Sequence, residues 1–368
     1  EDVGALKTRL DLSRTRGFSR FVGRSDEVAT LEAALARAME GHGQVIGVVA
    51  EPGVGKSRLC WEFVQRCRAR GIPVHDAQCV PHGKTIPYLP VLELMRKIHG
   101  VTEQDRPQTA REKIAGRLLL LDEGLRESLP LVFDFLGVPD PERPLPRMDP
   151  EARQRQLFAI VRRTVQARSR RETAVTVIED LHWVDGASEG FVETLVEAVA
   201  GTRTVLLLNF RPEYHAGWMQ RSYYQQLPLL PLGDEAVEEL LRELLGTGSA
   251  LAGLVALIRE RTAGNPFFVE EVVQSLAESG VLAGERGAYW LAQPVEAIAL
   301  PTSVQAILAA RIDRLGEREK TVTADSKSAG KEQGVFTMLF EAIAASQMKR
   351  AEREIAQYKD LLAPYENK

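Results

Sequence analysis

The chain has 368 residues, of which 44% are hydrophobic and 27% charged, and its formal net charge is −4. This length allows about two or three domains with a large buried core. The slightly negative charge argues against a general attraction to nucleic acid or anionic membranes, and no apolar run is long enough to span a bilayer. The start of the chain lacks the pattern of a signal peptide, and the three cysteines show no metal-ligand spacing. We therefore expect a cytoplasmic protein with reduced thiols.

The first residues precede any strong motif. Because the chain does not begin with methionine, we expect a fragment of a longer protein. Residues 1–20 are expected to form an N-terminal linker with a short amphipathic helix at 5–16. A compact turn, FVGR at 21–24, comes next, and apolar residues at helical spacing predict a helix after it.

The most informative segment is QVIGVVAEPGVGKS at 44–57. An apolar, β-branched run predicts a strand, a Gly/Pro turn follows, and a helical pattern begins directly after Gly55-Lys56-Ser57. This order is the arrangement that binds the phosphates of a nucleoside triphosphate. Glycines let backbone N–H groups face the phosphate oxygens, the lysine reaches the β- and γ-phosphates, and the serine hydroxyl is a Mg²⁺ ligand. A chance glycine turn is the alternative, and the flanking strand and helix argue against it.

We call residues 50–57 the phosphate loop. Ala50 stands where the strict pattern has glycine, and a small residue suffices there because the strand ends at that point. The residues expected to contact the nucleotide in this region are Glu51, Pro52, Gly53, Val54, Gly55, Lys56, Ser57 and Arg58. Lys56 is also expected to act in catalysis, and Ser57 to bind the metal.

Strands alternate with helices through the first two thirds of the chain. Further strands are predicted at 72–79, 174–178 and 204–209, and helices at 57–69, 151–169 and 188–200. This alternation predicts an α/β fold: a P-loop NTPase core at 21–230, with a parallel sheet flanked by helices and right-handed crossovers.

Beyond Pro231 the sequence predicts no strand. Helical patterns at 234–246, 249–262, 267–280 and 301–315 predict an all-helical lid domain at 231–318. The polar residues 319–334 predict a flexible linker, and apolar spacing from Val335 predicts a helical tail at 335–368.

The strand at 174–178 runs into two acids, Glu179 and Asp180. An NTPase needs a carboxylate at the end of a neighbouring strand to hold Mg²⁺ and to position water. Alone, these acids would be an ordinary acidic strand end. Their place about 120 residues after the phosphate loop favours the functional interpretation.

Five motifs occur in a fixed order: GR at 23–24, AEPGVGKS, IEDLHWVD, NFRPE at 209–213 and GNPFF at 264–268. Together they resemble the STAND class of P-loop ATPases, over about residues 5–316. The similarity is greatest to a bacterial branch found in large regulators. Members of that branch often follow a class III nucleotide cyclase domain or precede helical repeats and a helix-turn-helix domain. The family continues into a winged-helix domain, whereas this chain continues into the polar segment after Glu319.

The resemblance implies a role for particular residues. Phe21, Val22, Gly23 and Arg24 match the segment that lines the adenine and ribose. Glu179 matches the metal-binding acid, Asp180 the acid that orients water, Arg211 the sensor of the γ-phosphate, and Pro266 the lid proline that packs on adenine and reports the nucleotide state. Phe21 and Val22 have the alternative of core packing, and Arg211 that of a surface ion pair. His182 and Trp183 are interpreted as packing residues, because a P-loop site needs neither.

These assignments predict an ATP-binding, slowly hydrolysing signalling switch that uses ATP/ADP and Mg²⁺. Many P-loop ATPases have Asp before Glu; the reversed order here gives Asp180 a shorter reach towards water and predicts slow turnover. The expected partners are an effector domain outside this chain, a cyclase or a transcription regulator, and further copies of the chain in the ATP state. The alternatives are a AAA+ remodelling ATPase and a nucleotide-gated scaffold with little turnover. Direct binding of nucleic acid is not expected.

Overall fold

The computed structural model describes residues 17–298. The helices expected at 5–16 and 301–315, the linker at 319–334 and the tail at 335–368 lie outside the described residues. The described chain forms two compact units. We call residues 27–49 and 59–228 the core unit, and residues 17–26, 50–58 and 229–298 the lid unit. The phosphate loop thus packs with the lid unit, although it follows the first core strand directly in sequence.

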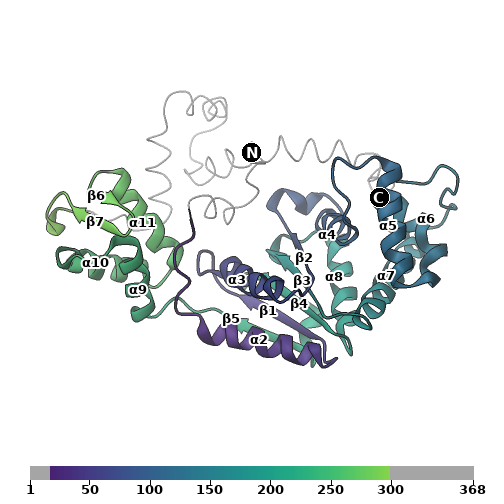
Figure 1. Cartoon of the computed structure of the whole chain (residues 1–368), viewed down its shortest axis with the longest axis horizontal. Coiled ribbons are helices and arrows are strands. Elements are labelled where there is room, and N and C mark those ends of the chain that lie inside the picture. The colour runs from purple at the N-terminus through teal and green to yellow at the C-terminus, as the bar shows by residue number, and fades with distance from the viewer. Residues whose placement is uncertain (1–16, 299–368) are drawn as a thin grey trace. The chain divides into compact units, whose positions relative to one another are not determined.

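The centre of the core unit is a five-stranded parallel sheet (Figure 1). Its strands are β1 (Gln44–Val49), β2 (Val74–Gln78), β3 (Ala174–Glu179), β4 (Thr204–Phe210) and β5 (Tyr224–Pro228), in the order β2-β3-β4-β1-β5. The α/β fold with a parallel sheet is confirmed. β5 was not predicted, because its sequence YQQLP has two glutamines and no apolar alternation. An edge strand tolerates such polar residues, since it borders only one other strand.

Helices cover both faces of this sheet. Leu206, Leu208 and Phe210 of β4 pack in one cluster with Phe191 and Leu195; the last two belong to α8 (Gly186–Val199). Asn209 lies between Leu208 and Phe210 and therefore faces the other side. There its Nδ2 lies 3.6 Å from the sulfur of Cys60, which belongs to α3 (Lys56–Ala69). The remaining helix at the start of the core unit is α2 (Ser25–Met39).

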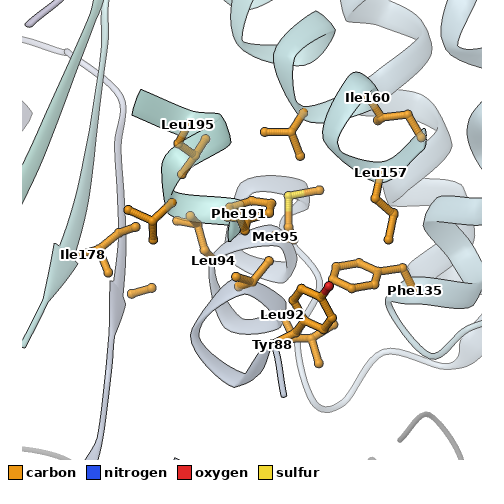
Figure 2. Close-up of a cluster of buried hydrophobic side chains, with 14 of the residues drawn as sticks. Tyr88, Leu92, Leu94, Met95, Phe135, Leu157, Ile160, Ile178, Phe191 and Leu195 are labelled. Carbon is orange, nitrogen blue, oxygen red and sulfur yellow. The ribbon is translucent and has the colours of Figure 1, made fainter. Parts of the chain in front are cut away.

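Four helices fill the connection between β2 and β3: α4 (Leu89–His99), α5 (Pro107–Leu121), α6 (Leu129–Phe135) and α7 (Pro150–Ser169). Figure 1 shows α5, α6 and α7 grouped beside the sheet. Their side chains meet those of α4 and α8 in one apolar cluster, which Figure 2 shows in close-up. The rings of Tyr88 and Phe135 pack edge to face there, with their centroids 5.5 Å apart.

A buried histidine at the end of α4 should make stability depend on pH. His99 is 1% exposed, and its Nδ1 lies 2.7 Å from the carbonyl oxygen of Met95. Burial lowers the pKa of His99 to about 4, opposed by that hydrogen bond and assisted by the charges of Arg168 and Arg117. The unfolded chain, with an ordinary pKa near 6.5, therefore binds more protons between those two values. Stability from this residue is present above about pH 6.5 and is lost as the pH falls towards 4.

We expect the free energy of unfolding to fall by about 1.4 kcal/mol per pH unit for this histidine across that window. Urea denaturation between pH 7 and pH 4.5 measures the slope. His99→Gln removes the titrating group and should give a shallower slope at a lower starting stability. An equal slope in both proteins would assign the pH dependence to other groups.

The lid unit contains three of the predicted helices: α9 (Asp234–Leu245), α10 (Ala252–Thr262) and α11 (Pro266–Glu278). Their apolar faces form a core of their own, which includes Leu241, Leu254 and Val272. The helices expected at 234–246, 249–262 and 267–280 are therefore confirmed.

The expectation that strands stop beyond Pro231 is wrong in one place. β6 (Leu282–Glu285) and β7 (Ala288–Leu291) form an antiparallel hairpin after α11. Each strand has only four residues, too few to show an alternating pattern. The signals present are Gly287, whose φ is +81° at the turn, and two aromatic residues in β7.

Candidate functional site

The phosphate loop leaves β1 at Ala50 and reaches α3 at Lys56. Gly53 and Gly55 have φ values of +85° and +108°, in the region that only glycine adopts at low cost. Ser57 and Arg58 lie in the first turn of α3, where unpaired N–H groups and the helix dipole favour an anion. The local backbone is therefore that expected of a phosphate-binding loop.

Every carbonyl oxygen from residue 50 to residue 54 accepts a hydrogen bond. Lys56 Nζ donates to the carbonyls of Ala50 at 2.6 Å and Glu51 at 3.2 Å. The other donors come from outside the loop, elsewhere in the lid unit: Asn265 Nδ2 to Pro52 O at 3.1 Å, Phe267 N to Gly53 O at 3.3 Å and Arg24 Nη2 to Val54 O at 3.0 Å. Lys56 is only 7% exposed, so its ammonium group lies within the loop.

Residues 21–24 lie close to the loop within the lid unit. Arg24 is buried, and its Nη2 also donates to the carbonyl oxygen of Leu230 at 2.8 Å. Val22 packs in the lid core. Phe21 is half-buried beside Arg58, whose guanidinium carbon is 5.7 Å from the ring centroid. Gly23 is exposed, and a Cβ there would meet Ala236 at 2.5 Å. The Arg24 guanidinium thus holds the backbone carbonyls of Val54 and Leu230, and the Val22 side chain packs in the core of the lid unit.

Arg58 and α11 complete the surroundings of the loop. The Arg58 guanidinium lies 4.0 Å from the centroid of the Phe18 ring and donates to the carbonyl of Ser19 at 3.0 Å. The Ser19 hydroxyl donates to the carboxylate of Glu270. Burial raises the pKa of Glu270, and the Ser19 hydrogen bond and the Arg58 charge oppose that rise. Pro266, the first residue of α11, has its Cγ 4.0 Å from where a Cβ of Gly55 would lie.

The two acids lie in the core unit and share one partner. Glu179 ends β3, and Asp180 follows it with a φ of +55°. Asn209 Nδ2 donates to Glu179 Oε2 at 3.1 Å, and its Oδ1 accepts from the Asp180 N–H at 2.8 Å. Gln78 Nε2 donates to Asp180 Oδ2 at 3.2 Å. A single buried amide therefore orients the side chain of one acid and the backbone of the other.

Sequence reasoning missed both of these partners. Asn209 is fully buried, and it is the one polar residue in the last part of the strand TVLLLNF. A buried polar group needs hydrogen-bond partners, so its position at a strand end was a usable signal. Gln78 pairs in register with Glu179, which only the strand order reveals.

Arg211 follows β4 directly, and its side chain is 34% exposed. Its Nη1 lies 3.9 Å from Glu213, and its guanidinium carbon lies 5.5 Å from the Trp183 ring centroid. Lys84 Nζ lies at the same distance from that ring, and the His182 ring is 5.0 Å away. Trp183 therefore contacts two cations, with the geometry of cation–π pairs.

Parallel strands bring several of these residues to one edge. In register, Val48 pairs with Asn209 and Ile178 with Leu208, so the carboxyl ends of β1, β3 and β4 share an edge. Glu179, Asp180 and Arg211 follow strands that end there, and the phosphate loop continues the chain from the last residue of β1. The carboxyl edge is where open α/β sheets bind ligands.

Within residues 17–298, no group of three or more His, Cys, Asp and Glu side chains could hold a metal ion alone. Mg²⁺ in phosphate sites keeps water and phosphate oxygens and takes one or two protein ligands. The Ser57 hydroxyl and the Glu179 carboxylate are hard oxygen donors of that kind. None of the helices in the same part of the chain is long and apolar enough to cross a membrane.

Comparisons with known proteins show which families this chain resembles. A model of the family described as AAA ATPase domain matches residues 20–208, and a model of a domain of unknown function (DUF8739) matches residues 233–288. The chain is 26% identical over 283 residues to the uncharacterized protein R02095 of Rhizobium meliloti (strain 1021). That match covers 75% of this chain and 27% of the relative, so the chain spans about a quarter of the relative's length.

Two solved structures are among those that match this chain. The Aeropyrum pernix ORC1 protein in complex with DNA gives a TM-score of 0.40 at 13% identity, over 93% of this chain and 84% of that chain. The HORMA:CdnC:Trip13 complex of E. coli MS115-1 gives 0.38 at 12% identity, over 70% of this chain and 81% of that chain. Both scores are too low to assign function. The AAA family model, in contrast, covers slightly more than half of the 368 residues and includes the phosphate loop and both acids, so the chain belongs to the AAA ATPase domain family, a family of nucleotide-binding P-loop ATPases.

Proposed function

We propose that the chain is an ATP-dependent switch of the STAND class. ATP or ADP binds at the phosphate loop with Mg²⁺, and Lys56 contacts the β- and γ-phosphates. When bound, Mg²⁺ would be held by Ser57 and Glu179, and it would neutralise charge on the phosphate oxygens. Arg211 contacts the γ-phosphate. The loop backbone, the helix start at Lys56 and the acids at the ends of parallel strands support this assignment.

The observation that carries the switch proposal is the direct bonding between the phosphate loop and α11. A nucleotide can shift a two-state equilibrium only if it interacts differently with the two states. The Asn265 side chain and the Phe267 N–H, at the start of α11, donate hydrogen bonds to the carbonyls of Pro52 and Gly53, so a change in loop shape acts directly on α11. Gain or loss of the γ-phosphate would change the shape of the loop, and the hydrogen bonds would transmit this change directly to α11.

The chemical step is phosphoryl transfer to water. A bond forms between the water oxygen and the γ-phosphorus, and the bond from that phosphorus to the bridging oxygen breaks. ADP and inorganic phosphate leave, and Asp180 orients the water. The residue is one methylene shorter than a glutamate, so it reaches less far towards the water. This geometry favours slow turnover, which suits a switch better than a motor.

The output of the switch is proposed to lie outside this chain, because the chain matches about a quarter of its relative R02095. The proposed partners are an attached or separate effector, a cyclase or a transcription regulator, and further copies of the chain in the ATP state. A AAA+ remodelling ATPase and a scaffold that holds ADP without turnover are the competing functions.

Three measurements on the purified chain separate these functions: the nucleotide retained through purification, the rate of ATP turnover, and the mass in solution with ATP or ADP. A switch should retain ADP, turn over at about 10⁻² s⁻¹ or slower, and change mass between the two nucleotides. A hexamer in both states with fast turnover would replace it by a remodelling ATPase. ADP retention with no measurable turnover would replace it by a scaffold.

A further inference from the structure

The outer side of the phosphate loop is held by donors that belong to distant parts of the sequence. Three successive carbonyls are involved, those of Pro52, Gly53 and Val54. Their donors are the Asn265 side chain, the Phe267 N–H and the Arg24 guanidinium. All of these residues belong to the lid unit, so the contacts lie within one compact body.

These contacts decide which way the loop's N–H groups face. In a trans peptide the C=O and the following N–H point to opposite sides of the chain. Holding the carbonyls of residues 52–54 outward therefore turns the N–H groups of residues 53–55 inward. Successive inward N–H groups form a concave anion site of the kind that binds phosphate. The outer contacts thus favour the binding shape of the loop before any nucleotide arrives.

Helix capping alone does not explain why residue 265 is an asparagine. Its Oδ1 accepts from the N–H of Phe268 at 3.2 Å and caps α11. Aspartate, serine or threonine would cap this helix about as well. Among these residues, only asparagine carries an N–H donor on an atom separate from the capping oxygen, and Nδ2 uses it on Pro52 O at 3.1 Å. The amide packs directly on the loop, since a Cβ on Gly53 would lie 2.7 Å from Oδ1 and 3.0 Å from Nδ2.

We propose that Asn265 is a positioning residue: its side-chain donor holds the phosphate loop in the anion-binding shape from the outside, without touching the nucleotide. This inference rests on the proposed nucleotide binding at that loop. By linkage, the same contact makes bound nucleotide strengthen the attachment of α11 to the loop. The contact of α11 with the loop would then raise the affinity for nucleotide, and bound nucleotide would strengthen that contact, in both cases through the Asn265 side chain.

Asn265→Asp tests this with a near-isosteric change. The variant keeps the capping oxygen, and replaces the donor with an oxygen that repels the carbonyl of Pro52. We expect amide exchange in residues 53–55 to accelerate without nucleotide, and affinity for a fluorescent ADP analogue to fall about 10-fold or more, the cost of leaving a loop acceptor unmatched. Exchange within α11 should not change, because the cap remains. A purely structural role would alter α11 as well.

Gln274→Glu is the matched control. It makes the same amide-to-carboxylate change on α11, at a half-buried side chain that bonds to Glu278. Its loop exchange and ADP affinity should equal those of the unaltered chain. If Asn265→Asp does not fold, Asn265→Ser, which keeps a capping oxygen and adds no charge, answers the same question.

The two proposals fail in different ways. If the unaltered chain binds no nucleotide, the proposed function is wrong, and loop exchange still decides the role of Asn265. If the unaltered chain binds ADP, and Asn265→Asp matches it in both loop exchange and affinity, the positioning role is wrong and the ATPase assignment stands.

Discussion

Replacing Lys56 by alanine should abolish ATP binding while the chain remains folded. The ammonium group lies within the loop, 7% exposed and bonded to the carbonyls of Ala50 and Glu51. Its role on the nucleotide is that of a point charge aimed at the β- and γ-phosphates. Removing a charge that faces phosphate in a closed site costs about 2–5 kcal/mol, which is a loss of affinity of about 30-fold to several thousand-fold.

Titration with a fluorescent ATP analogue in the presence of Mg²⁺ measures the affinity. Lys97→Ala is the control, because it removes a lysine that bonds to Asp76 on the surface of the core unit. Thermal unfolding without nucleotide should separate loss of binding from loss of fold. Unchanged ATP affinity in Lys56→Ala would contradict the phosphate-loop assignment itself.

The parts that could be predicted from the sequence are those that neighbouring residues determine. The phosphate loop is contiguous, so its glycines, lysine and helix start can be recognised together. The strands at 174–178 and 204–209 are mostly apolar and rich in valine and leucine, which is typical of strands buried on both faces. Their alternation with helices then favours the parallel sheet that the structure contains.

What could not be predicted depends on contacts between distant positions. Asn209 donates a hydrogen bond to Glu179, 30 residues away in the sequence, and Asn265 donates one to Pro52, 213 residues away. No local pattern encodes such pairs, because they follow from strand order and from the packing of α11. The predicted roles of residues 21–24 came from resemblance. Packing in the structure gives Val22 a place in the lid core and Arg24 two backbone carbonyls.

Substitutions of the two acids at the end of β3 should have separate effects on ATP binding and ATP hydrolysis. Glu179 has its Oε2 held by Asn209, and Asp180 has its Oδ2 held by Gln78. If Glu179 holds Mg²⁺ and Asp180 orients water, as proposed, their neutral amides should have different effects. Glu179→Gln should weaken the Mg²⁺-dependent part of ATP binding. Asp180→Asn should leave that binding intact.

Asp180→Asn is expected to reduce ATP turnover about 100-fold or more, the usual contribution of a positioned acid or base. The asparagine keeps the shape of the side chain, and its carbonyl oxygen still accepts from Gln78. Single-turnover hydrolysis and ATP affinity should be measured on the same protein. Asp76→Asn is the control, because it makes the same change at a surface aspartate of the neighbouring strand β2. Turnover at the unaltered rate would show that another group positions the water. Loss of turnover in Glu179→Gln with ATP binding intact would exchange the two roles, and would give the longer side chain the task of reaching the water.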